Sequence, residues 1–162
     1  MHYNQLVSII IPVRNEEKYI GQCLDCIINQ SYPIKNIELI IVDGCSVDGT
    51  INEINHYSKR LPRLIILEND KKTVPGSMNI GIKHSKGDYI IRVDARSFID
   101  KDYIKNCLKL LKKTKAWNVG GRQKGIEDGG LISKCISACL NSPFGMGGAK
   151  FHYSNKEQFV DT

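Results

Sequence analysis

Four short apolar runs alternate with polar loops and amphipathic segments along the first 115 residues of the chain. The runs are rich in Val, Ile and Leu, which is typical of strands buried in a parallel sheet. These predicted strands cover residues 6–11, 37–42, 64–67 and 89–93. Helical spacing of Ile and Leu predicts helices that begin after a cap at Asn15, near residue 50, at Pro75 and near residue 102.

This alternation predicts an α/β fold made of right-handed βαβ units, with a mostly parallel sheet and helices on both faces. If the strand order is 3-2-1-4, the ends of the first, second and fourth strands lie side by side. Ligands of such sheets bind outside the carboxyl ends of the strands. The residues that follow those three strands are therefore the candidate site.

The pattern is less regular after residue 115. Residues 116–121 form a candidate strand, 122–130 a loop, 131–140 an amphipathic helix and 141–162 an irregular tail. The helix over 131–140 has two interpretations, packing against the sheet or contact with a membrane surface. Because there is neither a repeat nor a linker, we expect one domain over residues 1–162, with 1–115 as its first half.

Composition narrows the classes of partner. With 41% hydrophobic and 25% charged residues among 162, the chain resembles an ordinary globular domain, and no apolar run approaches the roughly 20 residues that span a bilayer. We therefore expect a cytoplasmic protein. A net charge of +6 suits an anionic partner. Nucleic acid is not predicted, because the basic residues are dispersed and aromatic residues are not interleaved with them.

The chain has six cysteines, and Cys23 and Cys26 form a C-x-x-C pair. Such a pair occurs in zinc and redox sites. Here it lies in a predicted helix without a second ligand pair at suitable spacing, so we expect packing or surface thiols.

Acidic and basic residues follow the three converging strands. Asp43 ends the second predicted strand, and Asp94 and Arg96 follow the fourth. Carboxylates beside arginines suit a phosphorylated ligand held with Mg²⁺ or Mn²⁺, for which Asp94 is the candidate metal ligand. A strand-end acid can instead cap a helix, and Asp48 fits either role. Neither G-x-G-x-x-G nor G-x-x-x-x-G-K-[ST] occurs, which argues against a dinucleotide dehydrogenase and a P-loop enzyme.

Three stretches, VSIIIPVRNEEKYIGQCLDCI, IELIIVDGCSVDGT and GSMNIGIKHSKGDYIIRVDARS, resemble in order and spacing the N-terminal half of family 2 glycosyltransferases of the GT-A fold. The DAR sequence and the later SPFGMGGAKF are similar to the bacterial exopolysaccharide, succinoglycan-type branch. The resemblance implies transfer of a hexose from a nucleotide-diphospho-sugar, with a UDP-sugar favoured, to a polysaccharide or lipid-linked saccharide. It also implies work at the inner face of the cell membrane.

The same resemblance implies roles for individual residues, all of them in a nucleotide-sugar site. Asp43 would accept a hydrogen bond from the base ring, and Asp94 would hold the metal that bridges the diphosphate. The residues implied in this site are Pro12, Arg14, Asn15, Glu16, Asp43, Gly76, Asn79, Asp94 and Arg96.

The chain departs from the family pattern in two ways. Arg96 stands where the D-x-D metal motif has its second acid, so that an arginine can contact phosphate directly. The general base of an inverting transferase is not identified, because none of the acids after Asp102 has a matching context; they are Glu127, Asp128, Glu157 and Asp161. The resemblance thus implies that residues 116–162 only begin the acceptor half, and that the chain can be a donor-binding fragment without transferase activity. A nucleotidyltransferase is a third interpretation, but its Gly-rich basic loop after the first strand is absent.

Overall fold

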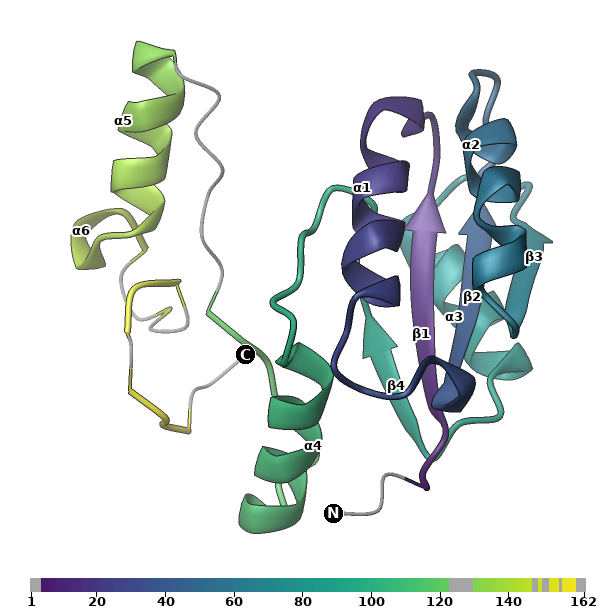
Figure 1. Ribbon diagram of the computed structural model, residues 1–162. Helices are drawn as coiled ribbons and strands as arrows, with labels where there is room; N and C mark the ends of the chain where they lie inside the picture. Colours follow the sequence, from purple (N-terminus) through teal and green to yellow (C-terminus); the bar gives the residue numbers. More distant parts are fainter. Residues whose placement is uncertain (1–3, 123–129, 147–148, 150–151, 155, 160–162) are drawn as a thin grey trace. The chain divides into compact units, whose positions relative to one another are not determined.

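The computed structural model describes residues 4–122, 130–146, 149, 152–154 and 156–159. The chain divides into two compact units, Met1–Asn106 and Cys107–Thr162. The first unit contains the sheet and the carboxyl ends of its strands (Figure 1). The second contains helices α5 and α6.

The sheet of the first unit has four parallel strands in the order β3-β2-β1-β4. They are β1 (Val7–Val13), β2 (Ile37–Asp43), β3 (Leu64–Glu68) and β4 (Tyr89–Arg92). Val7 of β1 lies opposite Ile37 of β2 and Tyr89 of β4, which fixes the register of the central three strands. The predicted α/β class and the predicted strand order are both confirmed.

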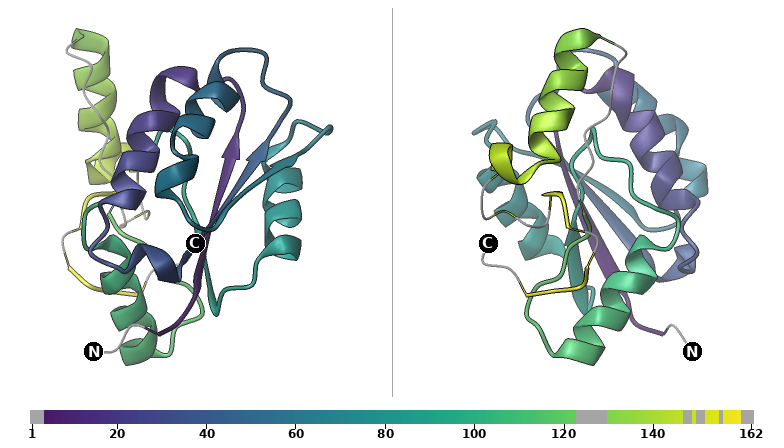
Figure 2. Two further views of the ribbon diagram at one scale, coloured as in Figure 1. Left: turned by 45° about the vertical axis from the view of Figure 1, so that its right-hand side comes forward. Right: turned by 90° about the vertical axis from the view of Figure 1, so that its left-hand side faces the viewer.

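Helices cover both faces of this sheet. Helices α1 (Glu17–Ile28) and α2 (Thr50–His56) lie against one face, and α3 (Val74–His84) lies against the other (Figure 2). Two short 3-10 helices, η1 (Ile34–Asn36) and η2 (Ser58–Arg60), precede β2 and β3. The predicted helices of this unit are therefore present where the sequence pattern places them.

The burial of the strands explains their apolar runs. Ile9, Ile10 and Ile11 of β1 are all fully buried, because successive side chains point to opposite faces and both faces carry a helix. Ile10 belongs to a core cluster with Ile40 and Val42, against which side chains of β3 and α3 pack. The outer strands β3 and β4 are only partly buried, as expected for the edges of the sheet.

The remaining elements are helical. Helix α4 (Tyr103–Thr114) begins in the first unit and ends in the second, which also contains α5 (Leu131–Leu140) and α6 (Pro143–Met146). The helix predicted over residues 131–140 is confirmed. The strand suggested for residues 116–121 is wrong: Trp117 there is fully exposed, and no described strand pairs with this segment. Without a partner for its backbone, an apolar run of this length does not form a strand.

Helix α3 approaches β1 most closely at Gly81. A Cβ atom at this position would lie 2.5 Å from Cγ2 of Ile10, in the middle of the core. We expect Gly81→Ala to lower the free energy of unfolding by about 1 kcal/mol, because an overpacking cost of about 1–3 kcal/mol is offset only in part by the roughly 1 kcal/mol that alanine gains over glycine in helix propensity. Urea denaturation measures this change. Gly120→Ala is the control, since a Cβ there has no neighbour within 4 Å; equal stability of both variants would contradict the packing described.

Candidate functional site

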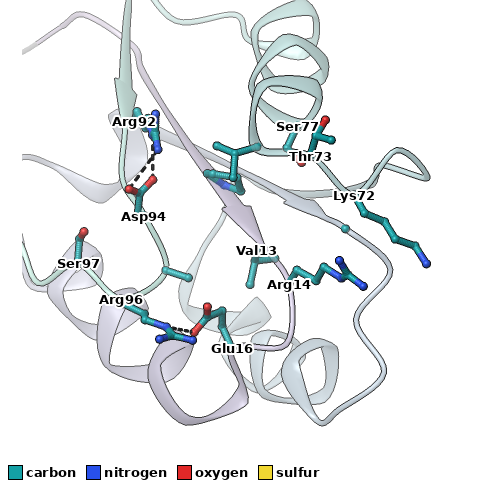
Figure 3. A pocket seen from close by; sticks show the side chains of 14 residues that line it. Val13, Arg14, Glu16, Lys72, Thr73, Ser77, Arg92, Asp94, Arg96 and Ser97 are labelled. Atoms are coloured by element: carbon teal, nitrogen blue, oxygen red, sulfur yellow. Dashed lines mark hydrogen bonds and ion pairs between the residues drawn. The ribbon is translucent and has the colours of Figure 1, made fainter. Parts of the chain in front are cut away.

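A cavity of about 530 Å³ lies at the carboxyl ends of β1 and β4 and beside the first turn of α3 (Figure 3). Four basic and two acidic side chains line it, so its wall carries an excess of positive charge. The lining residues are Pro12, Val13, Arg14, Glu16, Gly44, Lys72, Thr73, Val74, Ser77, Arg92, Asp94, Ala95, Arg96 and Ser97. Five of the nine residues predicted for the site are in this set: Pro12, Arg14, Glu16, Asp94 and Arg96.

Asn15 connects the loop after β1 to the loop after β2. Its backbone has φ of 54°, its N–H donates to Oγ of Ser46 at 2.9 Å, and its side-chain oxygen accepts from the N–H of Val47 at 2.9 Å. The sequence pattern predicted that Asn15 caps α1, and this prediction is wrong. The cap position of α1 is occupied by Glu16, whose side chain makes no cap hydrogen bond. The asparagine was misassigned because its side chain serves a loop distant in sequence.

A second set of hydrogen bonds joins the same two loops. The N–H of Glu16 donates to Oγ1 of Thr50 at 2.8 Å, and a carboxylate oxygen of Glu17 accepts from the N–H of Gly49 at 3.1 Å. Asp48 accepts from the N–H of Thr50 at 3.1 Å and from its hydroxyl, and these bonds hold the pKa of Asp48 below its usual value. Asp48 therefore bonds the first residue of α2, although the cap position of this helix is Gly49. Its contact with a ligand stays a prediction.

Asp43 lies within its own loop instead of in the cavity wall. The side chain is 4% exposed, and its two oxygens accept from the N–H and the hydroxyl of Ser46. Since these bonds hold the loop after β2 in shape, Asp43 supports the neighbouring Gly44, which does line the cavity. Its contact with a base ring stays a prediction.

Asp94 follows β4 and forms a bidentate ion pair with Arg92. Nε of Arg92 lies 2.8 Å from Oδ1 of Asp94, and Nη2 lies 3.2 Å from Oδ2 (Figure 3). Both side chains are 53% exposed. The backbone carbonyl of Asp94 accepts from the thiol of Cys23 at 3.7 Å, so helix α1 fixes the backbone while the carboxylate stays accessible.

Arg96 pairs with Glu16 across the mouth of the cavity. Nε of Arg96 donates to Oε2 of Glu16 at 2.7 Å (Figure 3). The guanidinium also lies over the ring of Tyr19, 5.1 Å from its centroid. The hydrogen bond to Glu16, followed by its charge, raises the pKa of Arg96 above its usual value. Arg96 is thus held against α1 by Glu16, the cap residue of the helix, and by Tyr19 in its first turn.

Arg14 and Lys72 are the basic residues of the cavity that lack an acidic partner. Within residues 4–122, neither has a carboxylate at ion-pair distance. Figure 3 shows both side chains extending from the loops that follow β1 and precede α3. Since the two acids of the wall are already paired with arginines, Arg14 and Lys72 supply the positive excess available to an anion.

Buried Asn69 positions the loop that carries Lys72. Its N–H donates to the carbonyl of Asp43 at 2.7 Å, and its amide donates to the carbonyl of Thr73 and the hydroxyl of Ser77. The N–H of Lys72 donates to the carbonyl of Asn69 at 2.9 Å. Lys72 and Arg92 were missed by sequence reasoning. The signals that would have found them are a basic residue just before a helix and the i, i+2, i+4 spacing of Arg92, Asp94 and Arg96.

The two remaining predicted residues lie on α3 outside the cavity wall. Gly76 donates its N–H to Oγ1 of Thr73 in the first turn, and a Cβ at this position would lie 2.8 Å from that oxygen. Asn79 is exposed on the same helix. Roles for Gly76 and Asn79 in donor binding stay predictions.

The oxygen ligands of the cavity suit a divalent cation only if a bound ligand and water complete its coordination. Among the described residues, no group of three His, Cys, Asp or Glu side chains could enclose a metal ion. The exposed carboxylate of Asp94, beside a cavity suited to phosphate, fits a cation that takes most of its ligands from a diphosphate and water. The residues present therefore fit Mg²⁺ or Mn²⁺ held jointly with a ligand.

The structure describes one of the four acids that the sequence analysis considered as a general base. Of the four acids considered in the sequence, Glu157 pairs with Lys113 at 3.3 Å. The other three, Glu127, Asp128 and Asp161, lie outside the described residues.

Comparison with known proteins decides the family. The model of the family described as glycosyl transferase family 2 matches residues 8–159. The chain belongs to glycosyl transferase family 2. A curated relative from Methanococcus voltae, a dolichyl N-acetyl-alpha-D-glucosaminyl phosphate 3-beta-D-2,3-diacetamido-2,3-dideoxy-beta-D-glucuronosyltransferase, is 33% identical over 96% of this chain and 50% of its own length. A poly(ribitol-phosphate) beta-glucosyltransferase of Bacillus spizizenii is 33% identical over 77% of the chain and 20% of its own length.

Solved structures of glycosyltransferases share this fold. Staphylococcus aureus TarS in complex with UDP-GlcNAc has a TM-score of 0.68 and 25% identity, over 78% of this chain and 36% of its own. The mannosyltransferase PcManGT of Pyrobaculum calidifontis, in complex with GDP-Man and Mn²⁺, has a TM-score of 0.65 and 27% identity, over 75% and 36%. The predicted GT-A fold is confirmed. The chain spans about half or less of the length of these relatives and solved structures.

The reactivity of the buried Cys23 thiol tests how α1 packs against the loop that carries Asp94. Burial, followed by the nearby thiol of Cys26 and the carboxylate of Asp94, raises the pKa of Cys23 to about 12. Since only the thiolate reacts, about one Cys23 in ten thousand is reactive at pH 8. We expect a thiol reagent to modify the exposed Cys135 and Cys139 first and Cys23 last, as measured by mass spectrometry of digests. Labelling of Cys23 at the rate of Cys139 would contradict the described packing of α1.

The same thiol predicts how stability depends on pH. Above pH 9 the unfolded chain loses the Cys23 proton, whereas the folded protein keeps it up to about pH 12. We therefore expect the free energy of unfolding to fall as the pH rises from about 9 to about 12. Cys23→Ala should reduce this dependence in urea denaturation at a series of pH values; an unchanged slope would show that Cys23 is not the group concerned.

Proposed function

We propose that the whole protein is a glycosyltransferase that moves a hexose from a nucleotide-diphospho-sugar, with a UDP-sugar favoured, to a polysaccharide or lipid-linked saccharide acceptor. The observation that carries the proposal is the cavity at the ends of β1 and β4, which combines an accessible carboxylate, Asp94, with Arg14 and Lys72, neither of which has an acidic partner among the described residues. This combination of charges suits a metal-bound diphosphate.

The residues of the cavity bind different parts of the donor complex. Arg14 and Lys72 attract the diphosphate, and Asp94 holds the divalent cation. When bound, Mn²⁺ or Mg²⁺ neutralises the negative charge that develops on the departing nucleotide diphosphate. The Arg96–Glu16 pair holds the loop after β4 against α1, which keeps Asp94 at the cavity.

Relatives support the classes of donor and acceptor. TarS has been crystallised with UDP-GlcNAc, and PcManGT with GDP-Man and Mn²⁺. The names of the Methanococcus voltae and Bacillus spizizenii relatives specify a dolichyl-linked phosphate sugar and a poly(ribitol-phosphate). A lipid-linked or polymeric acceptor in exopolysaccharide synthesis, at the inner face of the cell membrane, is our proposal for this chain. No described helix is long and apolar enough to cross a membrane.

A second candidate function is donor binding without transfer. We propose residues 1–115 as the nucleotide-sugar-binding half and 116–162 as the start of the acceptor half. The observation that favours this candidate is that Glu157, the described member of the four acids considered as a general base, pairs with Lys113 on the surface. In that case the chain binds a UDP-sugar but leaves the acceptor hydroxyl protonated.

Two assays separate these candidates. Calorimetry measures the binding of UDP with Mn²⁺, and a coupled assay measures hydrolysis and transfer from a UDP-sugar. We expect binding, and we expect Asp94→Asn to remove the part of the UDP affinity that depends on Mn²⁺. Binding without turnover supports the donor-binding fragment, whereas the same Mn²⁺ dependence in Asp94→Asn would refute the role of Asp94.

Lys72 provides a test that does not depend on the metal. We expect Lys72→Gln to weaken UDP binding about tenfold, the loss typical of one charge-assisted hydrogen bond. Lys83→Gln is the matched control, because Lys83 lies in the last turn of α3 and outside the cavity wall. Equal affinities of the two variants in calorimetry would place the diphosphate elsewhere.

A further inference from the structure

The two arginine–carboxylate pairs of the cavity differ in accessibility. In the Arg96–Glu16 pair, the side chain of Glu16 is only 16% exposed, and Arg96, although 66% exposed, also lies over Tyr19. In the Arg92–Asp94 pair, both side chains are 53% exposed. The carboxylate of the first pair is thus mostly buried, whereas the carboxylate of the second is open to a ligand in the cavity that both pairs line (Figure 3).

An exposed ion pair of this kind is easily exchanged. Water competes for both partners, so the pair adds little to the stability of the fold. Arg92 nevertheless engages the whole carboxylate, because its guanidinium donates to both oxygens of Asp94. While Arg92 stays there, Asp94 has no oxygen free of it, and a cation that approaches alone must displace a positive charge.

A diphosphate changes this balance. Its oxygens offer the guanidinium of Arg92 a bidentate partner at least as good as a carboxylate, and Arg92 already lines the cavity. Once Arg92 turns to the diphosphate, both oxygens of Asp94 are available to a divalent cation.

We propose that Arg92 exchanges partners when the donor binds: it neutralises Asp94 in the free protein and binds the diphosphate when a divalent cation occupies Asp94. This rests on the proposed function, because it concerns the same donor site. The exchange makes cation and nucleotide bind cooperatively, and each raises the affinity for the other by the same factor.

The test is the factor by which saturating Mn²⁺ increases the affinity for UDP, measured by calorimetry for the wild type and for Arg92→Gln. We expect this factor to fall at least about fivefold in Arg92→Gln, because the exchange that couples the two ligands is gone. In the absence of nucleotide, we expect Mn²⁺ to bind Arg92→Gln more tightly than the wild type, as measured by electron paramagnetic resonance of free Mn²⁺.

Arg60→Gln is the matched control. Arg60 pairs with Asp25 at 3.1 Å, the two side chains are 52% and 46% exposed, and neither lines the cavity. We expect this variant to keep the wild-type factor. The same factor in all three proteins would overturn the exchange and leave donor binding intact. A wild-type chain that binds no UDP, with or without Mn²⁺, would overturn both the exchange and the proposed function.

Discussion

The hydrogen bonds between the loops that follow β1 and β2 are the constraint on which the site depends. A parallel sheet ends all its strands at one edge, where the backbone leaves the ladder and must find other partners. Here Asn15, Ser46 and Thr50 supply those partners across the two loops. As a result, these hydrogen bonds hold the loop in which Arg14 and Glu16, on either side of Asn15, line the cavity.

The charges of the cavity follow from this frame. Both acids of the wall are neutralised by arginines that come from β4 or the loop after it, while Arg14 and Lys72 have no carboxylate at ion-pair distance within residues 4–122. An unneutralised positive excess beside a helix-covered sheet attracts an anion, and it makes the cavity unsuited to a bare cation. The family membership and the electrostatics of the site thus support the same class of ligand, a nucleotide diphosphate.

Much of the fold was predictable from the sequence, because strands buried on both faces must be apolar throughout and helices against them must be amphipathic. The order of the strands is the usual one for such sheets, which the sequence analysis assumed. The details of the site were less predictable, since many of them depend on pairings between residues distant in sequence. Asn15 looked like a helix cap but bonds the loop after β2. Asp43 bonds Ser46 in its own loop, a local contact that the sequence pattern did not reveal, and its predicted contact with a base ring stays a prediction. Arg92 was overlooked because a basic residue in an edge strand ordinarily faces solvent.

The central claim is that the cavity between β1, β4 and α3 binds the diphosphate of a nucleotide. A crystal structure of the chain with UDP and Mn²⁺ tests it most directly. The account predicts the diphosphate beside Arg14 and Lys72, with the cation at the carboxylate of Asp94. UDP bound at another surface, with Asp94 still paired to Arg92 and no cation beside it, would contradict the account.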